Sequence, residues 1–310
     1  MADLSVRFEM KNLGEVECFL GLEVERADQG YFVSQRGYAR SLLERFNMGE
    51  SKEMATPMES NLKLKKDEGK PLKDAKKFRQ LVGSLIYLTI TKPEISYSVG
   101  VVAQFMQNPR SYHLDVAKRI LRYVKGTISY GLLYKNCDNF LLSGFVDADW
   151  AGDSNDRRST TGYCFDIGSA VVSWCSKKQD TVALSSSEAE YVAATMAAQE
   201  CVWLKRLIGD MLSNVDYPVQ IKCDNESAIK LASNPVFHAR TKHIEVRHHF
   251  IREKVLNQEV KLEGVCTNNQ VADIFTKALA KSKFELFRAA LGVVDREFAL
   301  RGSVKISAKL

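Results

Sequence analysis

The chain has 310 residues, of which 45% are hydrophobic and 26% charged, and its formal net charge is +6. A chain of this size and composition buries a sizeable core and is expected to form two compact units. No stretch approaches a transmembrane span, and the N-terminus lacks the apolar run of a signal peptide, so we expect no membrane partner.

The cysteines indicate a reducing environment. They are seven in number, widely spread and without a CxxC pair, and most lie in apolar strand-like or helical contexts. This usage is typical of small core residues in a reduced compartment, and it disfavours a zinc site. We therefore expect an intracellular location, cytoplasmic or nuclear.

The positive charge is concentrated in the first part of the chain. Lys and Arg number 22 against 16 Asp and Glu in residues 1–135, and 22 against 22 in residues 136–310. A basic region beside a neutral one suggests a polyanion partner, whose phosphates would be attracted by the positive field. Ordinary solvated lysines would give the same count, so the alternative stays open.

The first elements in chain order form an α+β pattern. We predict a strand at residues 17–25, a turn at Gly30, a second strand at 31–35 and a helix at 37–47. Residues 51–77 contain two prolines and several lysines with little periodicity, which predicts a long exposed connection.

Three helices are predicted next, at residues 78–90, 95–106 and 113–125. The third has an apolar stripe, and three basic residues with helical spacing share another of its faces: Lys118, Arg122 and Lys125. Such a face could follow a phosphate backbone, although a solvated helix face would look similar.

After about Gly126 the pattern becomes that of an α/β domain. Strands are predicted at 139–150, 161–168 and 170–179, joined by short polar turns, and a long helix at 185–212. The remaining predicted elements are strands at 218–224 and 260–267 and helices at 225–234, 242–257 and 269–280. This order fits a mixed five-stranded sheet flanked by helices.

Four acidic residues lie at strand and helix ends of this second region. They are Asp147, Glu190, Asp224 and Asp273. A two-metal phosphodiester site needs several hard oxygen ligands around two cations that lie about 4 Å apart. Adjacent strands and nearby helix starts bring such ligands together, so these acids are the candidate metal-binding and catalytic residues.

The motifs around these acids resemble those of a known family. Residues 140–280 are similar to the ribonuclease H domain of copia-type LTR retrotransposon Pol polyproteins, through "DADWAGD", "DRRSTTGYCF", "VALSSSEAEYVA", "CDNESAIKLASNPVFHARTKHIEVRHHFIRE" and "VADIFTKAL". Residues 1–135 resemble the end of the same polyprotein's reverse transcriptase, through "MKNLGEVECFLGLEVE", "LVGSLIYLTITKPEISYSV" and "KRILRYVKGT".

The resemblance implies a division of the chain. It implies a partial reverse transcriptase at 1–135, with primer-grip hairpin, thumb and connection, and a ribonuclease H-like domain at 136–292, followed by a C-terminal tail at 293–310. Reverse transcriptase needs two adjacent catalytic aspartates, and the sequence contains no Asp-Asp pair. We therefore expect that the polymerase site lies upstream and that this chain has no polymerase activity.

The resemblance also assigns the acids. Strand alternation places Asp147 and Asp149 on one face, so the residues alone do not separate them. The family's first-strand Asp is followed five residues later by Gly and a polar residue, which fits Asp147 with Gly152 and Asp153. Asp149 then falls outside the metal site, and its role stays open.

For the helix, the family pattern fits "EYVAA", which begins at Glu190, and does not fit Glu188. Residues two apart on a helix point about 200° away from one another, so at most one of the two reaches the site. Each candidate has a structural alternative. Glu190 follows Ser187 with the spacing of a capping box, Asp224 could cap the next helix, and Asp273 could be an acid at a helix N-terminus.

The chemistry implied is metal-assisted hydrolysis of the RNA strand of an RNA–DNA hybrid. The expected cofactor is a pair of Mg²⁺ ions, with Mn²⁺ as a substitute, and Asp147 is expected to bridge them. Crowded acids raise one another's pKa, so metal binding should also relieve strain in the fold. The 2′-hydroxyls in the minor groove would distinguish the RNA strand.

Two further features bear on nucleic acid. Many ribonucleases of this type carry a histidine in the loop before the last acid, and "EGVCTNNQVAD" has none, so histidine-assisted product release is not expected. Arg240 and Lys242 lie in a segment rich in basic residues and are candidates for nucleic-acid contact, although solvated positions are equally compatible.

Two classes of function therefore remain. One is an active ribonuclease H with a basic N-terminal region that binds the duplex. The other is a non-catalytic binding module derived from a retroelement. Four intact acids favour the first, and the absence of a polymerase palm favours the second.

Overall fold

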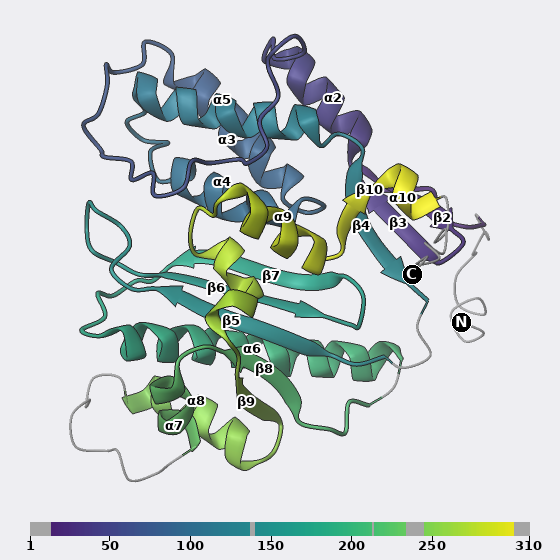
Figure 1. The fold of residues 1–310 in the computed structure, drawn as a ribbon, viewed down its shortest axis with the longest axis vertical. Helices are drawn as coiled ribbons and strands as arrows, with labels where there is room; N and C mark the ends of the chain where they lie inside the picture. The colour runs from purple at the N-terminus through teal and green to yellow at the C-terminus, as the bar shows by residue number, and fades with distance from the viewer. Residues whose placement is uncertain (1–13, 137–139, 213, 234–244, 301–310) are drawn as a thin grey trace, which may run out of the picture.

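The computed structural model describes residues 14–136, 140–212, 214–233 and 245–300, with side chains from residue 250 in the last range. Two five-stranded sheets organise these residues. In Figure 1 the helices of the first half lie above the second of these sheets, and the long helix α6 (Ser186–Met211) lies beneath it. Within the described ranges, no helix is both long and apolar enough to cross a membrane.

The first sheet is antiparallel and joins distant parts of the chain. Its order is β1 (Cys18–Phe19), β2 (Leu22–Ala27), β3 (Gly30–Ser34), β4 (Tyr130–Lys135) and β10 (Val293–Asp295). The single strand predicted at 17–25 is wrong, because Leu20 and Gly21 adopt positive φ angles of 48° and 77° and break it into two strands. Strand β4 was not predicted.

The helices of the first half pack into one bundle. They are α2 (Arg36–Arg45), α3 (Ala75–Leu88), the 3-10 helix η1 (Pro93–Ile95), α4 (Ser96–Ala103) and α5 (Ser111–Gly126). Asp74 caps α3 by accepting the backbone N–H groups of Lys76 and Lys77. The predicted apolar stripe of α5 is buried, which accounts for its place at the centre of the bundle.

The connection before α3 is less exposed than predicted. Met58 and Leu64 are only 2% and 4% exposed and belong to the bundle core. Two of the basic residues predicted to contact nucleic acid instead bind the start of this connection. Arg122 Nε donates to the carbonyl of residue 52 (2.6 Å), and Lys125 Nζ donates to the carbonyl of residue 51 (2.8 Å). Lys118 is exposed. Nucleic-acid contact by these three residues stays a prediction.

The second sheet has the predicted mixed topology. Its order is β7 (Val171–Lys178), β6 (Thr160–Asp166), β5 (Ser143–Asp149), β8 (Val219–Cys223) and β9 (Val260–Gly264). The pairs β7–β6 and β6–β5 are antiparallel, and β5–β8 and β8–β9 are parallel. Three helices lie on one side of this sheet: α6 (Ser186–Met211), α7 (Glu226–Ser233) and α8 (Glu245–Leu256). The α/β fold class is confirmed.

Side-chain alternation along the strands creates two cores. Tyr163 and Phe165 in β6 point to the α6 side, whereas Cys164 between them belongs to the opposite core. That opposite core is continuous with the helical bundle, because α4 and α9 (Lys281–Ala290) cover this face of the sheet (Figure 1). The two halves of the chain therefore share one hydrophobic core.

The helix predicted at 269–280 is wrong. The chain forms two 3-10 helices there, η3 (Thr267–Asn269) and η4 (Val271–Phe275), and the α-helix α9 begins only at Lys281. The Gln270 side chain fixes this geometry, since its Nε2 donates to the Val146 carbonyl (2.8 Å) and its Oε1 accepts the Ala272 N–H (3.3 Å). One bond within the segment and one to a distant strand thus hold the chain in the 3-10 form.

Residues 293–300, which sequence analysis assigned to a tail, are part of the fold. Strand β10 pairs with β4, and α10 (Arg296–Leu300) follows it. Arg296 forms an ion pair with Glu25 of β2 (2.6 Å). Residues 301–310 lie outside the described residues.

Gly292 provides a test of the junction between α9 and β10. Its φ is +79°, and a Cβ atom there would lie 2.5 Å from Ala170 Cβ, while its carbonyl accepts the Leu133 N–H (3.0 Å). We expect Gly292→Ala to lower the free energy of unfolding by roughly 2–4 kcal/mol, from backbone strain and overpacking together. Denaturant unfolding followed by circular dichroism measures this change.

Gly83 is the matched control. It lies on the exposed side of α3, and an added Cβ would meet nothing within 4 Å. Gly83→Ala should therefore raise the free energy of unfolding by about 0.5–1 kcal/mol, because alanine favours the helix. Equal effects of the two substitutions would contradict the role assigned to Gly292.

Candidate active site

Asp147 lies in the middle strand of the second sheet, where η4 approaches it. The residue is 2% exposed, and its partner across the strand pair is Gly162 of β6. A Cβ on Gly162 would lie 2.6 Å from Thr276 Cγ2 and 2.8 Å from Phe275 Cβ. Because glycine stands at this position, residues 275 and 276 pack directly on the sheet beside Asp147.

This close approach surrounds Asp147 with donors. The Thr276 hydroxyl donates to Asp147 Oδ2, and Lys277 Nζ lies 3.4 Å from the same oxygen. Lys277 Nζ also lies 2.7 Å from Asp273 Oδ1, and Lys283 Nζ lies 2.6 Å from Asp273 Oδ2. Asp273 is 1% exposed, so two lysines compensate a buried carboxylate.

Glu190 lies near the start of α6 and does not cap it. Ser185 is the cap and accepts the Glu188 N–H (3.2 Å), and Glu188 Oε2 accepts the Leu184 N–H (2.8 Å). Glu190 is 6% exposed, and its Oε2 has no hydrogen-bond partner. Glu188 and Glu190 have the same spacing from a serine, but Glu188 belongs to the helix cap and Glu190 is buried in the cluster.

Asp224 follows β8 and is likewise not a cap. Asn225 performs that role, since its Oδ1 accepts the Ala228 N–H (3.0 Å) at the start of α7. One potential ligand atom each from Glu190, Cys223 and Asp224 lie within 4.8 Å of one another. The structure therefore brings Asp224 to Glu190, with the Cys223 thiol beside them.

Burial and mutual repulsion shift the protonation of this cluster. Burial raises the pKa of Asp147 to about 6, although the Lys277 ammonium opposes the shift. Burial, together with the charges of Asp147 and Asp224, raises the pKa of Glu190 to about 9. Burial alone would lower the pKa of Lys277, but the carboxylates of Asp147 and Asp273 outweigh it and raise that pKa. All four predicted acids thus act on one electrostatic centre.

The donor set fits a hard divalent cation. Carboxylate oxygens are the ligands that Mg²⁺ prefers, and the unpaired buried oxygen of Glu190 lacks a partner that a cation would supply. Burial raises the pKa of the Cys223 thiol to about 12, so it stays protonated and is a poor ligand for such an ion.

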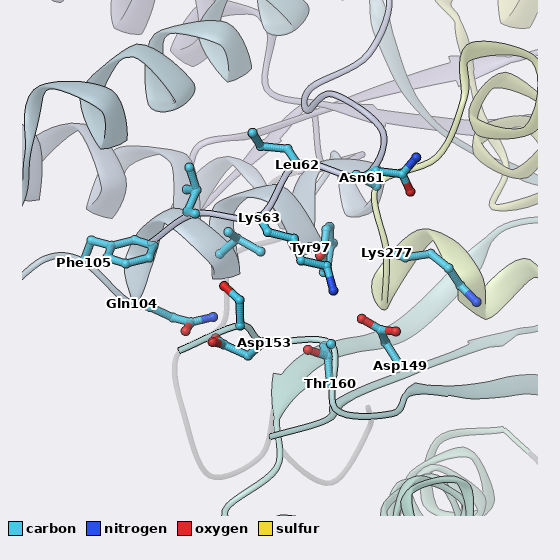
Figure 2. A pocket seen from close by; sticks show the side chains of 15 residues that line it. Asn61, Leu62, Lys63, Tyr97, Gln104, Phe105, Asp149, Asp153, Thr160 and Lys277 are labelled. Carbon is cyan, nitrogen blue, oxygen red and sulfur yellow. The ribbon is translucent and has the colours of Figure 1, made fainter. Parts of the chain in front are cut away.

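A cavity of about 220 Å³ is lined in part by Lys277 and Asp149. Figure 2 shows Lys277 and Asp149 at one side of it, Phe105 and Gln104 at the other, and Tyr97 between them. Asp149 therefore faces the cavity between the two halves of the chain. This agrees with strand alternation, which places Asp149 on the same face of β5 as Asp147. The cavity is built from residues of both halves.

Lys277 and Thr276 are site residues that sequence analysis missed. Both lie inside "VADIFTKAL", and Lys277 is four residues after Asp273, the spacing of an ion pair on a helix. That spacing was the available signal. The predicted nucleic-acid contacts Arg240 and Lys242 lie outside the described residues.

A five-stranded mixed sheet that holds four acids at its centre and at the starts of neighbouring elements defines a ribonuclease H-like domain. Solved structures show weak likeness. A ribonuclease H1 isolated from compost shares 13% identity and a TM-score of 0.34, over 44% of this chain and 92% of that one. A foamy viral protease-reverse transcriptase with double-stranded DNA shares 11% identity and a TM-score of 0.42, over 81% and 44%.

The sequence relatives are closer. Residues 1–60 match the family described as "Reverse transcriptase (RNA-dependent DNA polymerase)". The retrovirus-related Pol polyprotein from transposon TNT 1-94 of Nicotiana tabacum is 42% identical over 94% of this chain and 22% of its own length. That from transposon RE2 of Arabidopsis thaliana is 41% identical over 98% and 21%.

A mitochondrial protein of Arabidopsis thaliana, described as uncharacterized, is 43% identical over 64% of this chain and 83% of its own length. The chain belongs to the copia-type retrotransposon Pol polyprotein family. It spans about a fifth of the length of the transposon polyproteins that it matches.

The raised carboxyl pKa values predict how Glu190 affects stability without metal. Above pH 5 the unfolded chain has largely released the Glu190 proton, whereas the folded chain keeps it up to a pKa of about 9. The folded state then binds more protons, so this group lowers the free energy of unfolding as the pH rises. We expect Glu190→Gln to melt a few degrees above the wild type at pH 8 in chelator, since about 1 kcal/mol corresponds to roughly 2–4 °C.

The difference in melting temperature should narrow towards pH 5. Thermal melts from pH 5 to 9 in chelator, followed by circular dichroism, provide the measurement. A Glu190→Gln variant that melts below the wild type at pH 8 would show that the Glu190 carboxylate is not destabilising in the metal-free protein.

Proposed function

We propose that the chain contains an active ribonuclease H that hydrolyses the RNA strand of RNA–DNA hybrids endonucleolytically and depends on divalent metal. The observation that carries this proposal is the convergence of four acids from β5, α6, the end of β8 and η4, with one buried Glu190 oxygen left without a partner. A buried carboxylate oxygen without a partner is costly, so its retention in Glu190 fits a catalytic role.

The four predicted acids would hold the metal. Glu190 and Asp224 are drawn together at one end of the cluster, and Asp273 lies at the other, with Asp147 coupled to both ends. Two bound Mg²⁺ ions would activate a water molecule and stabilise the leaving 3′-oxygen of the scissile bond.

The protein's own residues prepare this site in two ways. Thr276 and Gln270 fix η4 against β5, so the Asp147 carboxylate has one orientation. Glu190 retains its proton near neutral pH in the metal-free chain, and this proton must leave before its carboxylate can act as a ligand. Binding of metal is therefore coupled to proton release.

The proposed substrate is a hybrid duplex that extends over the basic N-terminal region. Exposed Lys118 on α5 is one candidate contact to the phosphate backbone, and the shared core fixes α5 relative to the catalytic sheet. Backbone contacts of this kind position a duplex without reading its sequence. We propose no DNA polymerase activity, because the chain contains no Asp-Asp pair.

Asp224→Asn and Glu190→Gln provide the decisive test. Each should reduce Mg²⁺-dependent cleavage of a labelled RNA–DNA hybrid at least about 100-fold, since removal of a group that acts on the developing charge costs a factor of that order. Initial rates on a denaturing gel measure the change.

Glu188→Gln is the matched control. Its side chain accepts the Leu184 N–H, and the amide oxygen of glutamine retains that ability, so cleavage should stay within about threefold of the wild type. Absence of cleavage by the wild type, or equal rates for wild type and Asp224→Asn, would contradict the proposed ribonuclease H activity. Hybrid binding without cleavage would favour the non-catalytic module.

A further inference from the structure

Lys277 occupies the space between two of the proposed metal ligands. Its ammonium lies 2.7 Å from Asp273 Oδ1 and 3.4 Å from Asp147 Oδ2. These two carboxylates are 1% and 3% exposed, whereas the Lys277 side chain is 40% exposed. A single ammonium on a partly exposed side chain thus bridges two buried acids that come from different elements.

Lys283 makes a useful contrast. Its ammonium lies 2.6 Å from Asp273 Oδ2 and donates to the Thr267 carbonyl (3.3 Å), and no ion pair joins it to Asp147. Lys283 therefore neutralises one acid from outside the cluster. A cation that bound both Asp147 and Asp273 would need the position that the Lys277 ammonium occupies.

The Lys277 side chain borders a cavity that offers its ammonium a second position. Its backbone is fixed, since its N–H donates to the Asp273 carbonyl (3.0 Å). Its side chain, however, borders the cavity of about 220 Å³ (Figure 2). Rotation about the lysine side-chain bonds can therefore withdraw the ammonium from the acids without a change in the fold.

We propose that Lys277 is a built-in counter-ion for the position between Asp147 and Asp273, and that a divalent metal ion must displace it to bind there. The inference rests on the proposed ribonuclease H function, because it concerns the same acids. It adds a residue that sets metal affinity: the ammonium stabilises the metal-free site and competes with the ion that activates it.

The competition has a defined electrostatic origin. A monovalent ammonium reduces the repulsion between the buried carboxylates when no metal is present. A metal ion that takes its place must first separate two ion pairs, and an ammonium that remained nearby would repel the metal. Removal of the ammonium should therefore strengthen metal binding and weaken the metal-free fold.

The experiment compares Lys277→Met with Lys283→Met and Lys277→Arg in the full chain. Isothermal titration with MgCl₂ should give a Kd about tenfold lower for Lys277→Met, which corresponds to about 1.4 kcal/mol. The same variant should melt below the wild type in chelator and recover more stability on addition of Mg²⁺. Lys277→Arg should keep the wild-type affinity within about threefold.

Lys283→Met distinguishes competition from a general charge effect. If Lys277 competes at a shared position, Lys283→Met should change the Kd by less than about threefold. Equal strengthening by both substitutions, or unchanged or weaker binding by Lys277→Met, would overturn the proposal. Lys277→Gln, which keeps a polar group at the same position, replaces Lys277→Met if that variant does not fold.

The binding measurement needs no hybrid, so the two proposals can fail separately. Tighter Mg²⁺ binding by Lys277→Met in a protein that cleaves no hybrid would contradict the proposed enzyme function and support the counter-ion role of Lys277. Cleavage by the wild type with unchanged binding by Lys277→Met would contradict only the counter-ion role. Absence of Mg²⁺ binding by every variant would contradict both proposals.

Discussion

The repulsion between buried carboxylates is the constraint around which this protein is built. Buried charges are unfavourable unless protons or opposite charges accompany them, and the cluster uses both. Glu190 is held protonated near neutral pH, and ammonium groups accompany Asp147 and Asp273. The absence of a side chain at Gly162 serves the same end, because it lets Phe275 and Thr276 pack on the sheet, and Lys277, which follows them, then lies beside Asp147.

The second sheet depends on the first half of the chain to cover one of its faces. Buried polar contacts reinforce this shared core. Lys92 Nζ donates to the Thr127 carbonyl (2.6 Å), and burial lowers its pKa to about 8, while the Tyr123 hydroxyl donates to Glu94 (3.1 Å). These two contacts stabilise the bundle itself, whereas Asn155 Nδ2, which donates to the Leu64 carbonyl (2.9 Å), joins the second half of the chain to the first.

The sequence was informative wherever local pattern decides structure. Strand alternation and element order predicted the second sheet, and the resemblance to the retrotransposon family assigned the four acids that the structure brings together there. Spacing alone did not distinguish Glu188 from Glu190, because the two differ in burial, which depends on the tertiary fold. Strand β4 and the 3-10 form of η4 were also beyond prediction from the sequence, since they depend on pairing with β10 and on the Gln270 bond to a distant strand.

Strand β10 has a consequence for how the protein is made. It completes a sheet whose first strands begin at Cys18, so about 275 residues separate the two edges. During synthesis the first sheet is completed only after nearly all of the ribonuclease H-like region has left the ribosome. Its four earlier strands leave the β4 edge unpaired until then, and an unpaired edge is prone to association with other chains. The first half of the chain therefore carries this unpaired edge while the second half is still being synthesised.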